Sequence, residues 1–335
     1  MSRVLLLGPS FFGYRDLVGR GLSRLGHEVE VADDRPSESV AFRSLAKVSY
    51  APLAPAIERH ARRLERRLRE GRHDLVVYLG GMTFCLSPAQ LARLRAATGA
   101  SFAAYLWDSL ANSPRVDACL GLFDRVLSFD PADCAARGLE LRPLFFSGPF
   151  REVPLAPAGG FEYDACFVGS VHQPSKFEAV LGIIEALEAQ GLRVLSHLYM
   201  PSRSAEALRR ATRPSYRRAA LTRTPLTARE VARAYAASRA VIDSPQPGQS
   251  GLTMRTLEAV GARRKLITAN PEALRYDLAG SGQVMAWDGG AGAAGFVSSP
   301  FRELPADVYE SYSAEAFCRA LAGGGEPFGG YSPGA

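Results

Sequence analysis

The stretch 243–270, DSPQPGQSGLTMRTLEAVGARRKLITAN, decides the interpretation of this chain. It lies between two apolar runs: Val241 and Ile242 end the first, and residues 265–268 form the second. Three residues are expected to open a helix between them: Gly251, Leu252 and Thr253. The unpaired N–H groups and positive dipole end of a helix N-terminus suit a diphosphate. The stretch therefore predicts a phosphate-binding loop between two strands.

Two side chains of the predicted helix extend this interpretation. Glu258 could accept hydrogen bonds from ribose hydroxyls. Arg255, with the hydroxyl of Thr253, could stabilise charge that develops on a phosphate. An ordinary capped surface helix with a solvated Glu258 is the alternative.

Short apolar runs alternate with helical patterns along most of the chain. Strands are expected at residues 4–7, 29–32, 75–79, 102–106, 125–128, 141–145, 165–168, 193–197, 240–242 and 265–268. This alternation is typical of βαβ units and a mostly parallel sheet. We predict an α/β fold with two doubly wound, Rossmann-like domains that face a central cleft, with ligands at the carboxyl ends of the strands.

A proline- and glycine-rich segment, SGPFREVPLAPAGG at residues 147–160, is expected to link the domains. The predicted domains are residues 1–150 and 151–325, with a final helix, residues 313–321, that packs back on the first domain. Residues 326–335 are expected to be disordered because they are rich in glycine and proline.

The composition, 47% hydrophobic and 22% charged residues, is that of a globular protein, and no apolar run approaches the ~20 residues that cross a bilayer. Five cysteines without paired spacing indicate small core residues in a reducing compartment. We expect a cytoplasmic protein.

Several classes of site are disfavoured. The first loop, LGPSFFG, has Phe11 and Phe12 where a dinucleotide fingerprint has small residues, so an NAD enzyme is disfavoured. A second glycine pattern, Gly290, Gly292 and Gly295, is interpreted as a loop with no helix after it. The chain has no GxxxxGK[ST] motif and no Asp-x-Asp pair that would hold a metal on a diphosphate. We predict no metal and no cofactor.

Arginine accounts for most of the net charge of +6. Its clearest cluster, Arg62 to Arg72, lies on a predicted helix. Peripheral contact with anionic lipid at the inner face of a membrane is one interpretation, and a solvated face softened by Glu65 and Glu70 is the favoured one. No nucleic-acid motif is recognisable.

Four segments carry a family resemblance: YLWDS (105–109), FDRVLSFDPADC (123–134), YDACFVGSVH (163–172) and QSGLTMRTLEAVGARRKLITAN (249–270). In this order and spacing the chain resembles bacterial CgeB-like and lipopolysaccharide-biosynthesis glycosyltransferases. The resemblance implies the glycosyltransferase B architecture, with a nucleotide-sugar in the C-terminal domain and the acceptor in the N-terminal domain. It also implies a metal-independent transferase whose acceptor is a glycan, a lipid-linked sugar or a small molecule. A non-catalytic nucleotide-sugar-binding protein on the same fold is the alternative.

The predicted donor-binding residues are Gly169, Ser170, Arg223, Gln249, Ser250, Gly251, Leu252, Thr253, Arg255 and Glu258. His172 is a candidate for catalysis or a plain loop residue. Lys265 is interpreted either as added positive charge or as a cap of the preceding helix region.

On the acceptor side, Asp108 is the candidate general base, because it follows a predicted strand, although an aspartate there often only caps a turn. Trp107 is expected to stack on a sugar ring, and Gly13 is also assigned to this side. Asp130 precedes Pro131 and is expected to cap a helix.

Overall fold

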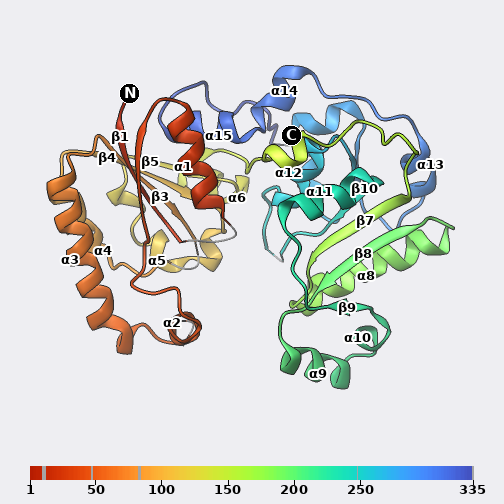
Figure 1. The fold of residues 1–335 in the computed structure, drawn as a ribbon, viewed down its shortest axis with the longest axis horizontal. Coiled ribbons are helices and arrows are strands. Elements are labelled where there is room, and N and C mark those ends of the chain that lie inside the picture. Colours follow the sequence, from red (N-terminus) through yellow and green to blue (C-terminus); the bar gives the residue numbers. More distant parts are fainter. Residues whose placement is uncertain (10–12, 47, 82–83, 247, 334–335) are drawn as a thin grey trace. The chain divides into compact units, whose positions relative to one another are not determined.

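The computed structural model describes residues 1–9, 13–46, 48–81, 84–246 and 248–333. The chain divides into two compact units (Figure 1). The N-terminal unit comprises Met1–Pro143 and Ala314–Phe328, and the C-terminal unit comprises Leu144–Ser313 and Gly329–Ala335. Each unit contains one parallel six-stranded sheet with helices. The predicted fold class, α/β with two doubly wound sheets, is confirmed.

The N-terminal unit has the sheet order β2-β1-β3-β4-β5-β6. Its strands are β1 (Arg3–Leu7), β2 (Glu28–Ala32), β3 (Leu75–Gly80), β4 (Ser101–Leu106), β5 (Arg125–Ser128) and β6 (Glu140–Leu141). Its helices are α1 (Tyr14–Arg24), α2 (Val40–Ala46), α3 (Ala54–Gly71), α4 (Pro88–Ala96), α5 (Pro114–Asp117), α6 (Pro131–Arg137) and α15 (Ala314–Leu321), with 3-10 turns at Ala51–Leu53, Leu110–Asn112 and Leu120–Leu122.

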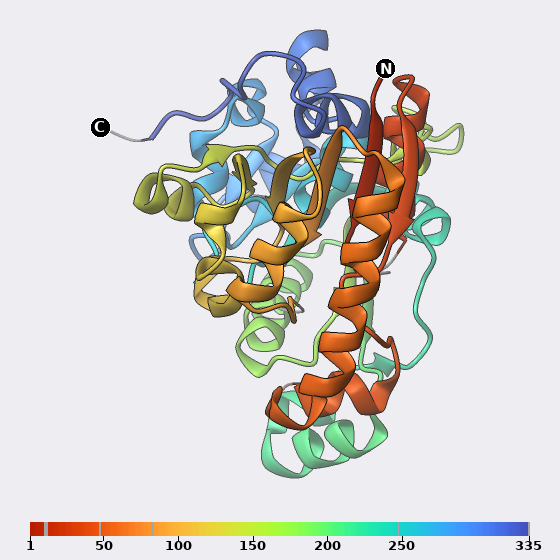
Figure 2. The same ribbon diagram turned by 90° about the vertical axis from the view of Figure 1, so that its left-hand side faces the viewer.

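Successive side chains of these strands point to opposite faces, so each face has its own packing partners. One face packs against α3 and α4, which lie side by side in Figure 2. α3 buries a stripe at helical spacing: Ile57, Ala61, Leu64 and Leu68. On the other face the ring of Tyr105 meets Phe317 of α15 edge-on at 4.6 Å, and α15 also packs on α1.

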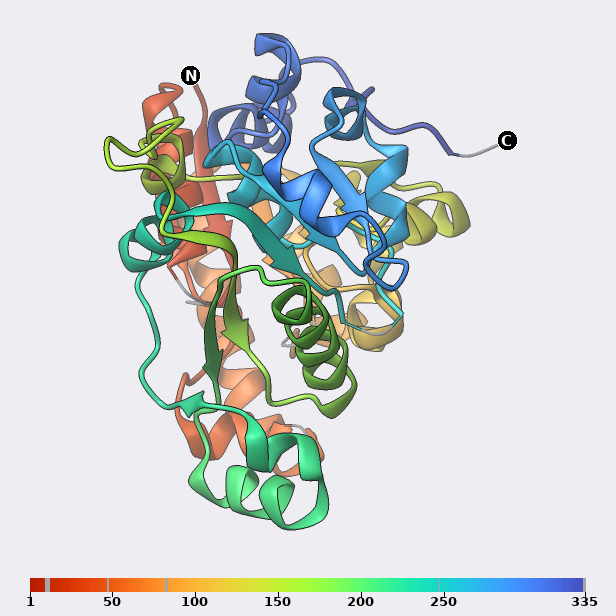
Figure 3. The same cartoon turned by 90° about the vertical axis from the view of Figure 1, so that its right-hand side faces the viewer.

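The C-terminal unit has the sheet order β12-β11-β10-β7-β8-β9. Its strands are β7 (Tyr163–Ser170), β8 (Val194–Tyr199), β9 (Leu221–Thr222), β10 (Ser238–Asp243), β11 (Lys265–Thr268) and β12 (Val284–Ala286). Its helices are α7 (Gly148–Arg151), α8 (Pro174–Ala189), α9 (Arg203–Thr212), α10 (Pro214–Arg218), α11 (Ala228–Ala236), α12 (Met254–Gly261), α13 (Ala293–Ser298) and α14 (Ala306–Ser311), with 3-10 turns at Pro271–Arg275 and Asp277–Ser281. The chain moves outward from β7 to β8 and β9, then returns to β10 beside β7, so the direction of winding reverses between β7 and β10 (Figure 3).

The central strands β7 and β10 are buried on both faces. Ala165, Phe167, Ala240 and Ile242 join the core beneath α8 and α13. The alternate residues Cys166 and Val241 join the core beneath α11 and α12. Apolar burial on both faces explains why these strands are continuous apolar runs in the sequence.

Two predicted boundary segments differ from the structure. The division falls between Pro143 and Leu144, before the predicted linker, residues 147–160. That linker includes α7, and its Phe150 and Val153 are buried in the C-terminal core, which anchors the segment to this unit. The predicted strand at 141–145 is reduced to Glu140–Leu141.

The last residues also differ from the expected disordered tail. Tyr331 pairs with Tyr276 through an antiparallel bridge, and its hydroxyl donates to Glu272 at 3.0 Å. The amide of Asp277 donates to the carbonyl oxygen of Gly330 at 2.8 Å. Aromatic packing and backbone pairing thus hold residues 330 and 331, which composition alone does not reveal.

Two helix starts were readable from local sequence. The Asp130 carboxylate accepts from the amides of Ala132 and Asp133, which confirms it as the N-cap of α6. Thr227 and Glu230, three residues apart in the sequence, form a capping box at the start of α11. In the part of the chain that the structure describes, no helix combines the length and apolarity that a membrane span requires.

Candidate functional site

The candidate site lies at the carboxyl edge of the C-terminal sheet, where β7 and β10 are neighbours. β7 ends at Ser170 and leads to α8, and β10 ends at Asp243 and leads to α12. In doubly wound sheets, ligands bind where the winding direction reverses, because the two loops leave in opposite directions and open a crevice. The order β10-β7 places that point here.

Asp243 organises this edge. Its side chain is fully buried and accepts hydrogen bonds from Thr253 Oγ1 at 2.7 Å, Arg255 Nη1 at 2.9 Å, Thr268 Oγ1 at 3.1 Å and Thr256 Oγ1 at 3.3 Å. A buried carboxylate is tolerated only with such partners. The network ties the end of β10 to the first turn of α12 and the end of β11. The sequence analysis placed Asp243 before the loop without assigning it a role.

Arg255 is held from three sides. Its Nε donates to the carbonyl oxygen of Val168 at 3.0 Å, and its guanidinium carbon lies 4.7 Å from the centre of the Phe167 ring. Burial disfavours the charged guanidinium and lowers the pKa of Arg255. The negative charges of Asp243 and Glu258 have the larger effect, so the pKa is raised. Among the described residues, Nη2 makes no hydrogen bond, and it remains for a ligand.

Gly169 makes this position of the guanidinium possible. A Cβ at Gly169 would overlap Nη2 of Arg255 and lie 3.1 Å from the Phe167 ring. Gly169 therefore contributes space rather than a ligand group. Its neighbour Ser170 hydrogen-bonds through Oγ to Nδ1 of the exposed His172 at 2.8 Å.

Lys176 is a second cation at this edge, and the sequence analysis missed it. It lies in the first turn of α8, and burial, followed by repulsion from Arg255, lowers the pKa of Lys176 to about 8. Two cations held close together with a helix N-terminus favour an anion between them. The available signal was QPSK after the β7 turn, where Pro174 marks a helix start.

Glu258 lies further along α12. Its Oε2 accepts a hydrogen bond from the buried hydroxyl of Tyr235 at 3.4 Å. Burial raises the pKa of Glu258 to about 7, and Arg255 acts in the opposite direction. Glu258 as a whole residue is half-buried.

The loop before α12 corrects one detail of the sequence analysis. The helix begins at Met254 rather than Gly251, with Thr253 as its N-cap. Thr253 Oγ1 accepts from the amide of Thr256 at 3.2 Å and donates to Asp243, so it shapes the helix start. The side chain of Leu252 is fully buried, so only its backbone is available for the predicted role.

Asn270 fixes the same loop from the end of β11. Its Nδ2 donates to the carbonyl oxygens of Ser250 and Gly251 at 3.1 and 3.2 Å. Gln249 and Ser250 are partly exposed at the tip of this loop. Asn270 is thus a positioning residue that the sequence analysis did not single out.

Two predicted cations lie elsewhere. Arg223 follows the edge strand β9 and pairs with Glu206 at 2.8 Å. In the sheet, β8 lies between β9 and β7. Lys265 is the first residue of β11, so it lies at the amino-terminal end of the strands. Its Nζ donates to Ser299 Oγ at 2.6 Å and to backbone carbonyls at the end of α13. Lys265 therefore caps α13, a later helix, and not the helix region that precedes it.

The glycine pattern at Gly290, Gly292 and Gly295 is followed by α13, contrary to the expectation of no helix. A Cβ at Gly290 would overlap the indole of Trp287. The glycine makes room for a packed side chain, a requirement that periodicity does not reveal.

The N-terminal unit carries the predicted acceptor residues at the carboxyl edge of its sheet. Trp107 and Asp108 directly follow β4, and the Asp108 carboxyl lies so close to Gly81 that a Cβ there would overlap it. Gly13 is the exposed N-cap of α1, with φ of 73°. Phe11 and Phe12 of the first loop lie outside the described residues.

Asp34 is a further acid of the N-terminal unit, in the loop after β2. It is fully buried; Tyr78 donates to Oδ2 at 3.4 Å, and Oδ1 has no hydrogen-bond partner among the described residues. Burial raises the pKa of Asp34 to about 7.

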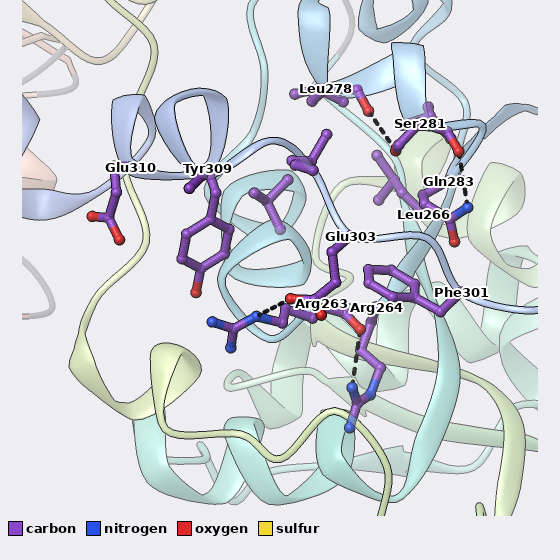
Figure 4. Close-up of a pocket in the computed structure, with 14 residues that line it drawn as sticks. Arg263, Arg264, Leu266, Leu278, Ser281, Gln283, Phe301, Glu303, Tyr309 and Glu310 are labelled. Carbon is purple, nitrogen blue, oxygen red and sulfur yellow. Dashed lines mark hydrogen bonds and ion pairs between the residues drawn. The ribbon is translucent and has the colours of Figure 1, made fainter.

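A separate pocket of about 200 Å³ opens at the amino-terminal edge of the C-terminal sheet (Figure 4). Its charged groups hold the fold together: Arg263 pairs with Glu303 at 3.4 Å, and the guanidinium of Arg264 donates to backbone carbonyls, including Pro154 at 2.8 Å. This pocket lies at the opposite end of the strands from Arg255 and Lys176.

Comparisons with known proteins identify the fold. No family model matches the chain, and no curated protein matches it in sequence. Among solved structures, an alpha-glucosyltransferase in complex with UDP and a 13-mer DNA superposes with a TM-score of 0.60 at 11% identity, covering 96% of this chain and 98% of the other. A UDP-GlcNAc 2-epimerase from Methanocaldococcus jannaschii gives 0.58 at 12% identity, covering 97% and 100%. A glycosyltransferase from Rickettsia africae ESF-5 gives 0.55 at 11% identity, covering 96% and 93%.

Identities this low support a statement about fold alone. The chain has two Rossmann-like domains of the glycosyltransferase B architecture. The narrower resemblance to CgeB-like enzymes stays a prediction.

Proposed function

We propose that this protein is a metal-independent glycosyltransferase that moves a sugar from a nucleoside-diphosphate sugar to a hydroxyl acceptor. One observation carries the proposal: Arg255 interacts electrostatically with both Lys176 and Glu258, on the two helices that follow the strands where the winding of the C-terminal sheet reverses. Two cations suit a diphosphate, and a neighbouring carboxylate suits ribose hydroxyls. The neighbouring structures of the same architecture include transferases, which agrees with this assignment.

Sugar transfer breaks the bond between the anomeric carbon and an oxygen of the β-phosphate, and a bond to the acceptor oxygen forms. The electron pair of the broken bond leaves on the diphosphate, whose negative charge rises. Arg255, held by Asp243, needs no reorientation to meet that charge, and preorganised charge of this kind lowers the barrier. Lys176, with a pKa of about 8, is mostly protonated at neutral pH and adds to the effect.

The acceptor hydroxyl must lose its proton. In an inverting reaction Asp108 of the N-terminal unit takes it, and in a retaining reaction the leaving phosphate takes it. Trp107 offers a face for the acceptor sugar. The acceptor class that we propose is a glycan, a lipid-linked sugar or a small molecule of bacterial surface polysaccharide or related biosynthesis.

The test is incubation with a panel of nucleotide-sugars and measurement of the free nucleoside diphosphate released by slow hydrolysis. Arg255→Gln and Lys176→Gln should each reduce release at least tenfold, the scale of one charge-assisted hydrogen bond. Arg223→Gln is the matched control, because this exposed arginine on the edge strand should leave release unchanged. Asp108→Asn should lower transfer to an added acceptor without changing donor affinity.

The products separate the alternatives. Binding of a nucleotide-sugar without turnover across donors and acceptors would indicate a non-catalytic binding protein. Conversion of the sugar without release of nucleoside diphosphate would indicate an epimerase. Loss of release in Arg223→Gln equal to that in Arg255→Gln would place the donor elsewhere.

A further inference from the structure

The segment 200–223, which leaves the carboxyl end of β8 and forms α9 and α10, carries an unusual charge. It contains seven arginines and one glutamate, and no lysine or aspartate, so its net charge of +6 equals that of the whole chain. α9 and α10 lie side by side next to β9 (Figures 1 and 3). We name this segment the α9–α10 surface.

Neighbouring carboxylates neutralise only part of this charge. Glu206 forms ion pairs with two of the arginines, Arg210 at 2.9 Å and Arg223 at 2.8 Å. Arg218 reaches Glu185 at 3.3 Å, with both side chains exposed, and Arg213 reaches Glu178 only at 4.0 Å. Exposed pairs of this kind contribute little free energy. Within the described part of the chain, Arg203 and Arg209 form no ion pair.

α9 also presents an apolar face to solvent. None of its residues is buried, and Leu208 is 59% exposed. Ala207 and Ala211 are exposed as well, and Ala211 lies one turn from both Leu208 and Ala207. An ordinary surface helix turns such a face toward the core.

α3 provides the contrast. It buries its apolar stripe, and several of its arginines pair with glutamates, including Arg62 with Glu58 at 3.0 Å and Arg69 with Glu65 at 2.8 Å. These pairs agree with the solvated face favoured for the Arg62 to Arg72 cluster. The segment 200–223 has an exposed leucine, which α3 lacks, and a net charge of +6 against +3 for α3.

We propose that the α9–α10 surface docks on the surface of an anionic lipid bilayer. Arginines pair with lipid phosphates, and an exposed apolar face flanked by arginines enters the boundary between headgroups and acyl chains. Leu208 is the side chain that enters, and Arg203, Arg213 and Arg218 are exposed cations of the same segment. This inference does not depend on the proposed transferase activity.

A nucleic acid fits the same surface less well. Binding of single strands uses exposed aromatic rings on which bases stack. The segment has one aromatic residue, Tyr216, and its ring is buried against Phe177 with centroids 3.8 Å apart. An exposed leucine gains nothing from contact with a phosphate backbone, whereas it can insert between the acyl chains of a bilayer.

The surface lies on the side of the unit that carries the candidate site. β8 ends at Tyr199, at the same edge of the sheet as the ends of β7 and β10. A bilayer bound here lies on the side of Arg255 and Lys176 rather than at the opposite edge.

The test is sedimentation of the full chain with vesicles of phosphatidylcholine alone and of phosphatidylcholine with phosphatidylglycerol. The wild-type protein should bind only the anionic vesicles, and less at high salt. The triple variant R203Q/R213Q/R218Q should bind about 100-fold more weakly, since each arginine near an anionic surface contributes about fivefold. Leu208→Ser, at an exposed position, should weaken binding severalfold without affecting folding.

The matched control is the triple variant R62Q/R63Q/R66Q on α3, which removes the same charge and should bind like the wild type. Circular dichroism and thermal unfolding establish that all variants are folded. Equal loss in the α3 variant would show that net charge alone drives binding. Failure to sediment with anionic vesicles would overturn the proposal, and tight binding to DNA without vesicle binding would assign the surface to nucleic acid.

Discussion

Glu258→Gln should make the protein more stable and its donor site weaker at the same time. Burial raises the pKa of Glu258 from 4.5 to about 7 in the folded protein. The folded state therefore holds a proton that the unfolded state has lost between these values. The contribution of Glu258 to stability is complete below pH 4.5 and is lost as the pH rises through 7.

The size of this loss follows from the shift. A difference of about 2.5 pKa units corresponds to at most about 3 kcal/mol. Glu258 as a whole residue is only half-buried, so we expect screening to reduce the value to about 1–2 kcal/mol at pH 8. Glutamine keeps the shape and cannot ionise, so it avoids this cost.

Urea denaturation at pH 5 and pH 8 measures the stability. Glu258→Gln should match the wild type within about 0.5 kcal/mol at pH 5 and exceed it by about 1–2 kcal/mol at pH 8. Calorimetry at pH 8 should show nucleoside diphosphate binding weaker by about 1.5–3 kcal/mol, the scale of hydrogen bonds to a charged group.

Tyr235→Phe is the control, because it removes the 3.4 Å hydrogen bond to Glu258 and leaves the carboxyl in place. It should change donor affinity much less than Glu258→Gln. If Glu258→Gln loses stability at pH 8, the carboxylate is a structural partner of Tyr235 and Arg255. If donor affinity is unchanged in a folded variant, the assignment to ribose is wrong.

Four further predictions follow from the same contacts. Donor affinity should fall as the pH rises through 8, the pKa of Lys176, and Lys176→Gln should remove this dependence in calorimetry; a flat wild-type profile would contradict it. Gly169→Ala should displace the guanidinium of Arg255 and weaken donor binding at least tenfold while the protein stays folded, and unchanged affinity would refute the role of that space. Because the pKa of Asp34 is raised from 3.8 to about 7, the stability advantage of Asp34→Asn should grow by about 2–3 kcal/mol between pH 5 and pH 8 in urea denaturation, and a constant difference would show that Asp34 is ionised in the fold. Turnover should survive a chelator, and loss with recovery on adding manganese would contradict metal independence.

Local patterns in the sequence were enough for the elements and many of their ends. Apolar runs of strand length marked β1, β5, β7, β10 and β11, because a strand buried on both faces has few polar residues. Asp130 before Pro131, and Thr227 with Glu230, marked helix starts, because a cap forms between residues two or three positions apart. Strand and helix alternation then limited the fold to doubly wound parallel sheets.

Only part of the candidate donor site could be predicted from the sequence. Arg255 and Glu258 lie on the helix that directly follows the glycine-containing loop. The sequence therefore indicated that these two side chains lie near the loop. Lys176 lies on another helix and meets Arg255 only because the sheet order puts β7 beside β10. In the sequence, Arg223 looked like a positive charge equivalent to Lys176. It follows β9, however, which lies at the edge of the sheet and away from β7 and β10.

The sequence by itself determined most of the strands, the class of fold and the segment that carries the predicted phosphate-binding loop, because each depends on residues close together along the chain. Only the tertiary structure decided which polar side chains share one network, and which basic segment presents its charge and its leucine to solvent. Asp243 at the end of β10 accepts hydrogen bonds from the first turn of α12 and from the end of β11, and Asn270 after β11 contacts the loop before α12. Such contacts depend on strand order and burial, and neither is encoded in any single local pattern.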